Sequence, residues 1–184
     1  MNLIKQFTFD DNLYELKNIF CITSKDFFEG GFDINATLEE KHRFYKIALE
    51  YSRLLKEMAI KFEDNIIIGK DISEKYIFEE WSDLKKYDAF NNICNTINKK
   101  QTYMLDIPKD FDIIDYIIEC DFRYFTNIDF YFERINLIVQ PTCHTEFFLF
   151  SDDYSSIISS IKEILQNFPS LELKEYDNSF CSSS

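Results

Sequence analysis

The sequence has 184 residues, of which 46% are hydrophobic and 17% aromatic, and its formal net charge is −13. This length suits one domain with a substantial core, and the aromatic content excludes an intrinsically disordered chain. No stretch approaches the roughly 20 apolar residues that a membrane helix needs, and the first residues contain no long apolar run typical of a signal peptide. We therefore expect a single domain, residues 1–184, with no membrane partner.

The negative charge is concentrated in the second half of the chain. Residues 1–100 hold 15 Lys and Arg against 18 Asp and Glu, whereas residues 101–184 hold 5 against 15. Phosphate contacts need basic side chains, so this imbalance disfavours direct binding of nucleic acid. It favours a basic protein as partner.

The five cysteines indicate a reducing compartment. Their number is odd, their spacing is wide, and no C-x-x-C motif occurs. Disulfide frameworks of secreted proteins are denser and hold an even number of cysteines. We expect free thiols that act as small apolar side chains, and a cytoplasmic location.

In the first half of the chain, one long helix is the clearest predicted element. Residues 3–9 suit a short strand, residues 10–20 a brief helix, and Gly30 with Gly31 marks a turn. Over residues 37–63, Thr37 and Glu40 form a T-x-x-E capping box ahead of apolar residues at helical spacing. These cover more than half of the circumference, which predicts a helix buried on more than one side. They are Leu38, Phe44, Tyr45, Ile47, Ala48, Leu49, Tyr51, Leu54, Leu55, Met58, Ala59 and Phe62.

The remaining pattern predicts strands that alternate with helices. A short buried strand is expected over residues 65–69, a helix in two pieces over 73–100, and a strand over 102–107. Pro108 suits the first turn of a helix that ends near Cys120. Residues 122–133 then alternate between apolar and polar, with space for a turn near 126–127, which predicts a half-buried antiparallel sheet with one wet face.

Further strands are expected over residues 136–140 and 146–150, joined across Pro141. A helix over 154–168, capped by Asp152 or Asp153, and a closing strand over 171–176 complete the chain. The predicted fold class is therefore α+β, in which a helical N-terminal half packs with a mostly antiparallel sheet and helices in the C-terminal half.

Two short motifs invite an enzymatic interpretation, and neither is complete. Residues 144–146 (HTE) match the H-x-E of zinc deaminases, but no P-C-x-x-C occurs and a strand-like run follows. Residues 172–174 (ELK) place a carboxylate and an amine on one strand face, as in restriction-type nucleases. Such a nuclease site also needs an upstream carboxylate, for which Asp152 and Asp153 are candidates, and a basic DNA-binding surface, which is lacking. The sequence thus favours a protein that is not an enzyme, with no catalytic residue, metal or cofactor.

The best candidate for a functional surface is the acidic second half. Asp112, Asp115 and Glu119 recur on one side of the expected helix at positions i, i+3 and i+7. Asp129, Tyr131 and Glu133 alternate on one face of the following strand. Together they predict a docking face in which carboxylates steer a basic partner and Tyr131 is an aromatic anchor. The competing interpretation is a solvated surface that keeps a Phe-rich protein soluble.

These observations lead to three hypotheses about function. The first is an acidic immunity or inhibitor protein that blocks a basic toxin or a nucleic-acid-acting enzyme. The second is a phage or host regulator that mimics DNA with its carboxylates. The third is a small enzyme whose site has no recognisable motif. We expect a monomer or a small homo-oligomer.

Overall fold

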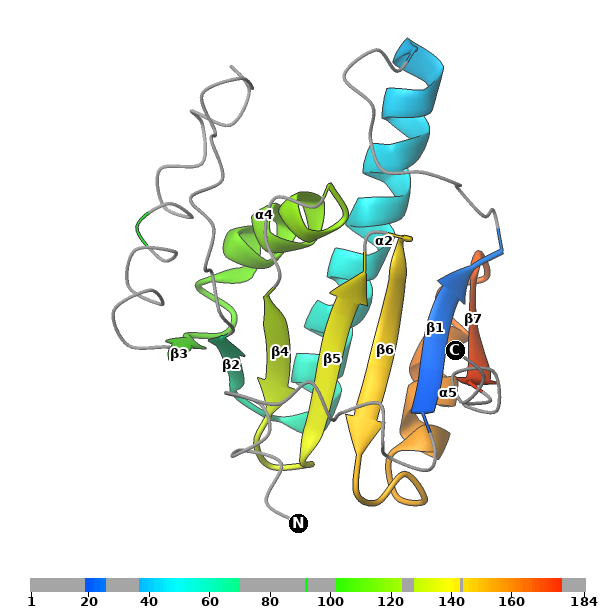
Figure 1. Cartoon of the computed structure of the whole chain (residues 1–184). Helices are drawn as coiled ribbons and strands as arrows, with labels where there is room; N and C mark the ends of the chain where they lie inside the picture. Colours follow the sequence, from blue (N-terminus) through cyan, green and yellow to red (C-terminus); the bar gives the residue numbers. More distant parts are fainter. Residues whose placement is uncertain are drawn as a thin grey trace, which may run out of the picture.

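The computed structural model describes residues 19–25, 37–69, 92, 102–123, 128–142 and 144–176. Within this part of the chain, seven strands form one antiparallel sheet in the order β3-β2-β4-β5-β6-β1-β7 (Figure 1). Helices α2, α4 and α5 pack on one face of this sheet. The elements are β1 (Ile19–Ser24), α2 (Leu38–Phe62), β2 (Ile66–Gly69), β3 (Thr102–Leu105), α4 (Phe111–Asp121), β4 (Asp129–Phe132), β5 (Leu137–Thr142), β6 (Glu146–Ser151), α5 (Ile158–Leu165) and β7 (Leu171–Tyr176).

Helix α2 begins with the capping box that its sequence predicts. The Thr37 hydroxyl accepts a hydrogen bond from the backbone N–H of Glu40 (3.2 Å), and the Glu40 carboxylate accepts one from the N–H of Thr37 (2.7 Å). This capping box satisfies amides that have no partner inside the helix. At the other end Glu63 adopts a left-handed conformation (φ 49°), and its N–H caps the last turn. The predicted helix is confirmed.

The main core lies between the sheet and its helices. Tyr51 of α2 is fully buried there, packs edge-on against Phe147 with ring centroids 4.6 Å apart, and donates a hydrogen bond to the carbonyl of Ile22 (3.1 Å). Nine residues of α2 are buried, which confirms that this helix is central to the core. Leu38 and Leu49 are exceptions to the predicted stripe, because they lie 77% and 53% exposed on the outer side.

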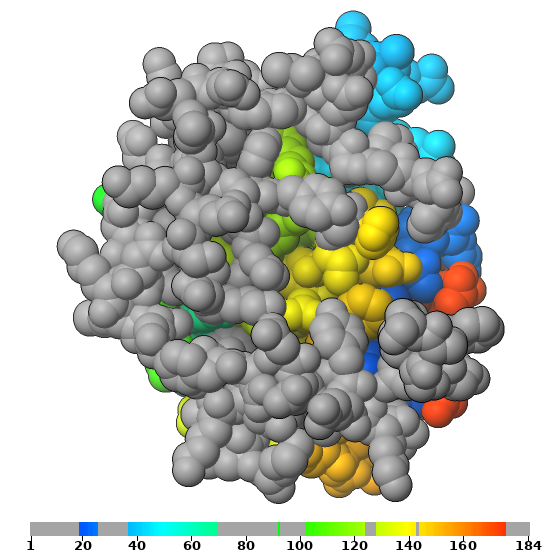
Figure 2. Space-filling view, viewed as in Figure 1, coloured from blue at the N-terminus to red at the C-terminus, as the bar shows by residue number. Residues whose placement is uncertain are grey.

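The opposite face of the sheet also holds buried side chains. Ile19, Tyr131, Ile138 and Phe150 form a second, smaller apolar cluster there. Figure 2 views this face, on which atoms of β5, β6, β1 and β7 follow one another from the centre toward the right edge. All four residues of β4 are buried. The expected wet face is therefore wrong for this strand, because apolar neighbours on β2 and β5 extend the second cluster across it.

Most predicted strands and helices of the second half are confirmed, with shifted ends. Pro141 lies inside β5 and does not join two strands. Pro108 belongs to a turn that precedes α4. The helix expected over residues 154–168 is shorter in the structure. Helix α5 has only eight residues, and turns precede and follow it.

In the first half, the expected helix over 10–20 is wrong at its end, because Ile19 and Phe20 begin β1. The predicted strand over 3–9, the turn at Gly30 and Gly31 and the turn near 126–127 lie outside the described residues. So does the predicted helix over 73–100, apart from Asn92, which is helical. Strand β2 confirms the prediction for residues 65–69.

Candidate functional site

The six residues predicted to form one acidic docking face lie on two separate parts of the fold. Asp112, Asp115 and Glu119 belong to α4, which packs on the helix side of the sheet. Asp129 and Tyr131 lie on β4 and point to the opposite face, as the cross-strand register requires. Glu133 follows β4 in the turn to β5. The structure does not bring the six together.

Two of the α4 carboxylates bind partners within the protein. Asp115 accepts hydrogen bonds from Ser52 and from the Lys56 ammonium, both on α2. Glu119 pairs with Arg123 at 3.0 Å, and the Arg123 side chain is only 1% exposed. Asp115 therefore connects α4 to α2, and Glu119 compensates a buried guanidinium at the end of its own helix, so both have a structural role.

Arg123 shows how this fold accommodates a guanidinium. Its Cζ atom lies 5.3 Å from the ring centroids of Phe44 and Tyr45, and its Nη2 donates to the Tyr45 hydroxyl at 2.6 Å. Aromatic faces attract a cation, and a weakly hydrated guanidinium tolerates such burial better than an ammonium does. Asp112 is the one α4 carboxylate of the predicted set that is exposed.

Asp129 and Tyr131 were expected on an exposed face, but in the structure both are buried, at 1% and 3% exposed. Asp129 accepts a hydrogen bond from the Gln140 side chain at 3.1 Å. The Tyr131 hydroxyl donates to the Asn136 side-chain oxygen, also at 3.1 Å. Burial raises the pKa of Tyr131, and the negative charges of Glu133, Asp64 and Asp152 raise it further. Tyr131 therefore marks where these three carboxylates gather at one end of the sheet.

The turn that carries Glu133 is built on a buried carboxylate. Asp64, directly after α2, accepts hydrogen bonds from the backbone N–H groups of Arg134 (2.8 Å) and Ile135 (3.3 Å). Burial raises the pKa of Asp64, and these hydrogen bonds oppose the rise. Glu133 itself is exposed. The arrangement holds the β4–β5 turn against the end of α2.

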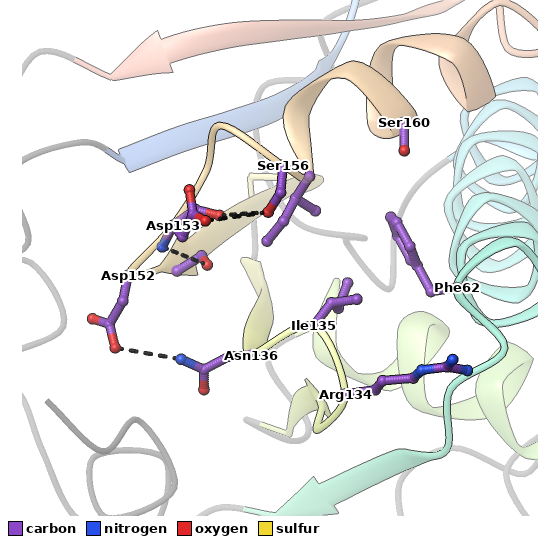
Figure 3. Close-up of a pocket in the computed structure, with 10 residues that line it drawn as sticks. Phe62, Arg134, Ile135, Asn136, Asp152, Asp153, Ser156 and Ser160 are labelled. Carbon is purple, nitrogen blue, oxygen red and sulfur yellow. Dashed lines mark hydrogen bonds between the residues drawn. The ribbon is translucent and has the colours of Figure 1, made fainter.

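A pocket of about 370 Å³ opens beside this turn, between the end of α2 and the segment that joins β6 to α5 (Figure 3). This volume lies at the lower end of the range of small-molecule sites, about 300–1,000 Å³. The pocket is lined by Phe62, Arg134, Ile135, Asn136, Ser151, Asp152, Asp153, Ser156, Ile157 and Ser160.

Apolar and acidic groups occupy different sides of the pocket. In Figure 3 the Phe62 ring and Ile135 stand on one side, while Asp152 and Asp153 lie toward the left edge. Asn136, in a left-handed conformation (φ 50°), donates a hydrogen bond to Asp152 at 3.3 Å and accepts one from Tyr131. Asn tolerates this backbone conformation better than most residues. The pocket thus has an apolar wall and an acidic rim.

Asp153 and Arg134 are both held in place by neighbours. Asp153 accepts hydrogen bonds from the N–H of Ser155 (3.0 Å) and its hydroxyl (2.5 Å), and they lower the pKa of Asp153. Asp153 therefore caps the turn that precedes α5. The N-cap of α5 itself is Ile157, without a side-chain hydrogen bond, so the expected helix cap by Asp152 or Asp153 is wrong. Arg134 donates to the carbonyl of Glu63 (3.3 Å) and lies 3.6 Å from its carboxylate. The one basic residue of the pocket lining is therefore compensated by Glu63.

The sequence does not predict this pocket. Its apolar spacing places Phe62 in the core stripe of a helix, and its Asp152 and Asp153 suit a helix cap. The available signal was the pair of carboxylates between a strand and a helix, which by itself is typical of capping. Nothing in the sequence predicts that this pair lies next to the end of α2.

The two enzymatic motifs do not assemble into a site. Glu172 and Lys174 pair with each other at 2.8 Å on β7. Glu172 lies level with Glu146 across β1, so Asp152 is about 20 Å away along the strands at roughly 3.3 Å per residue. Residues 144–146 form a hairpin turn and the start of β6, which confirms the strand interpretation.

Metal binding and thiol chemistry find no support in the described residues either. Among them, no three His, Cys, Asp or Glu side chains cluster in a way that could hold a metal ion. Cys21 and Cys120 are free and buried, and burial raises the pKa of the Cys21 thiol to about 12. A thiol with so high a pKa is a poor nucleophile at neutral pH.

Comparisons with known proteins do not place the chain in a family. No protein-family model matches the chain, and neither curated proteins nor solved structures give a match. None of the described helices has the length and apolar character needed to cross a membrane.

Proposed function

We propose that this chain is a small protein-binding protein of the immunity or inhibitor type, which docks a basic partner through the acidic end of its sheet. The observation that carries the proposal is the acidic rim around the pocket beside the β4–β5 turn. This docking face consists of Glu133, Asp152, Asp153 and the apolar wall of the pocket.

The charges of this face are available for a partner in a way that those of α4 are not. Asp115 and Glu119 compensate basic groups of the chain itself, whereas Glu133 and Asp152 are exposed. A cluster of exposed carboxylates accelerates association with a basic partner and repels acidic proteins. Asp112 is also exposed, on α4, and adds to the general negative field.

The same face supplies an apolar anchor. Phe62 is half-buried on the side of the pocket opposite the acidic rim and packs edge-on against Phe132, with ring centroids 6.3 Å apart. Interfaces gain most of their energy from a few well-packed apolar or aromatic groups that a polar rim surrounds. Phe62 thus takes the anchoring role that the sequence pattern predicts for Tyr131.

The test compares two charge reversals of equal size. The wild-type chain is used to capture partners from extracts of its source cells, and the purified partner is then measured against variants by surface plasmon resonance. Glu133→Lys with Asp152→Lys reverses the docking face. Glu39→Lys with Glu175→Lys makes the same charge change at exposed positions elsewhere.

We expect a basic partner whose association slows with rising salt, because exposed charges are screened beyond about 8 Å at 0.15 M. Reversal of the docking face should slow association at least about tenfold, and the control pair should change it much less. The proposal is refuted if no basic protein is captured, or if the partner binds the reversed face as fast as wild type at low salt.

A further inference from the structure

The pocket beside the β4–β5 turn points to a specific contact. We propose that this pocket binds one arginine side chain of the partner, a contact that rests on the proposed function. The methylene groups of the arginine would lie against the apolar wall, and its guanidinium would lie toward Asp152. Phe62, Ile135 and Ile157 form the apolar wall.

The lining suits a side chain that is apolar along its stem and cationic at its end. Arginine buries its methylene groups along apolar surface while its guanidinium seeks carboxylates. The pocket offers both kinds of surface, since Phe62 and Ile135 lie on one side and Asp152 with Asp153 on the other (Figure 3). Ser156 and Ser160 also line the pocket and add hydroxyl groups.

The chain already holds a guanidinium with the same combination of groups. Arg123 lies over the rings of Phe44 and Tyr45 at 5.3 Å and pairs with the carboxylate of Glu119 at 3.0 Å. The pocket presents one aromatic ring and carboxylates around a hollow of about 370 Å³. It therefore offers to a partner the surroundings that the fold uses for its own arginine.

Other occupants fit less well. An anion would be repelled by the carboxylates of Asp152 and Asp153. A purely apolar side chain would displace water from these carboxylates without replacing the hydrogen bonds that the water makes. A lysine ammonium is more strongly hydrated and has no plane to stack on Phe62. Arg134 does not supply a competing charge at the acidic rim, because Glu63 holds it at the other side of the pocket.

Asp152 has capacity for the contact. It is exposed, and one of its oxygens accepts a hydrogen bond from Asn136 at 3.3 Å. A carboxylate offers about four acceptor positions and can accept a guanidinium at both oxygens. Asn136 in turn is fixed by the Tyr131 hydroxyl, so buried Tyr131 acts as a positioning residue for Asp152.

The experiment uses small probes and the full chain. Nα-acetyl-arginine N-methylamide is titrated into the isotope-labelled protein, and amide shifts in NMR spectra are followed at Ile135, Ser156 and Ile157. The corresponding citrulline compound is the control probe, because it has nearly the same shape and no charge. We expect saturable shifts at these amides with a dissociation constant of roughly 1–10 mM for arginine, and binding of citrulline weaker by about tenfold.

Two variants connect the probe to the pocket. Asp152→Asn should weaken arginine binding at least about fivefold, since it removes the charge-assisted contact. Glu163→Gln removes the same charge from an exposed position of α5 and should leave binding within about a factor of two, because exposed charges interact weakly through solvent. Ser160→Trp fills the hollow and should abolish the shifts while the fold, monitored by the remaining amides, is retained.

The inference is overturned if the arginine probe gives no saturable shift at the pocket, or if citrulline binds equally well. These outcomes do not depend on the capture of a partner. If charge reversal of the docking face slows association but Ser160→Trp leaves affinity for the partner unchanged, the partner binds this face without inserting a side chain. The proposed function then holds and the pocket contact does not.

Discussion

Replacement of Leu55 by alanine tests whether α2 is the central element of the core. Leu55 is 0% exposed, and its neighbours Leu54 and Met58 are equally buried. Removal of three buried carbon atoms costs about 2.4 kcal/mol at roughly 0.8 kcal/mol for each. A cavity that persists adds about 24 cal/mol per Å³, so we expect a total loss of about 2.5–5 kcal/mol in the free energy of unfolding.

Leu49 provides a matched control on the same helix. It is 53% exposed, so Leu49→Ala makes the same chemical change on the outer side of α2. Because alanine is also a slightly better helix former, the free energy of unfolding should change by no more than about 0.5 kcal/mol. The comparison therefore isolates burial from helix propensity.

The measurement is equilibrium unfolding in urea, followed by circular dichroism. For Leu55→Ala the midpoint should fall while the slope of free energy against urea stays constant, since the slope reports the surface exposed on unfolding. Thermal unfolding should show a drop of about 5–20 °C, at roughly 2–4 °C for each kcal/mol in a chain of this size. Equal losses for the two variants, or a loss below about 0.5 kcal/mol for Leu55→Ala, would refute the central position of the helix.

Two further predictions concern carboxylates that the structure places in different surroundings. Asp115→Asn should lower the free energy of unfolding by about 1–3 kcal/mol, because it removes the negative charge from the part-buried ion pair with Lys56. Asp112→Asn, on the exposed side of α4, should lower it by less than about 1 kcal/mol, mostly through the lost interaction with the helix dipole. Urea titrations measure both losses, and a larger loss for Asp112→Asn would contradict the assignment. Burial raises the pKa of the Glu146 carboxyl, so the folded state binds the carboxyl proton more tightly than the unfolded state does. The protonated carboxyl therefore contributes to the free energy of unfolding below about pH 4.5, and this contribution declines as pH rises through the folded pKa. Glu146→Gln should therefore become more stable relative to wild type as pH rises from 4 to 7, and a difference independent of pH would show that the carboxyl is not perturbed.

The sequence predicts most elements correctly where periodicity and local signals agree. Helix α2 has a capping box and a broad apolar stripe, and β7 is a clear alternating run. Strand β1 was missed because Ile19 and Phe20 continue an apolar pattern that also fits the end of a helix. Only its pairing with β6 and β7, which lie far along the chain, decides between the two.

The candidate site was less predictable for a different reason. Sequence alternation shows that Asp129 and Tyr131 share a face, but it does not show that this face is buried. Glu119 pairs with Arg123, only four residues further along the chain, whereas Asp115 looks exposed in sequence because its basic partner Lys56 comes from α2. Partners of this kind become visible only when the helices are packed together.

The place of β1 in the sheet has a consequence for how the chain folds. This strand is made well before both of its neighbours in the sheet, because it pairs with β6 on one side and β7 on the other (Figure 1). Until those strands emerge from the ribosome, β1 is an apolar segment without its neighbours, and such segments associate readily with other chains. Contacts between distant parts of a sequence also slow folding, because a long loop must close before any of them forms. Nascent chains that stall before β6 should therefore depend on chaperones that shield residues 19–24, whereas chains released after β7 can close the sheet on their own.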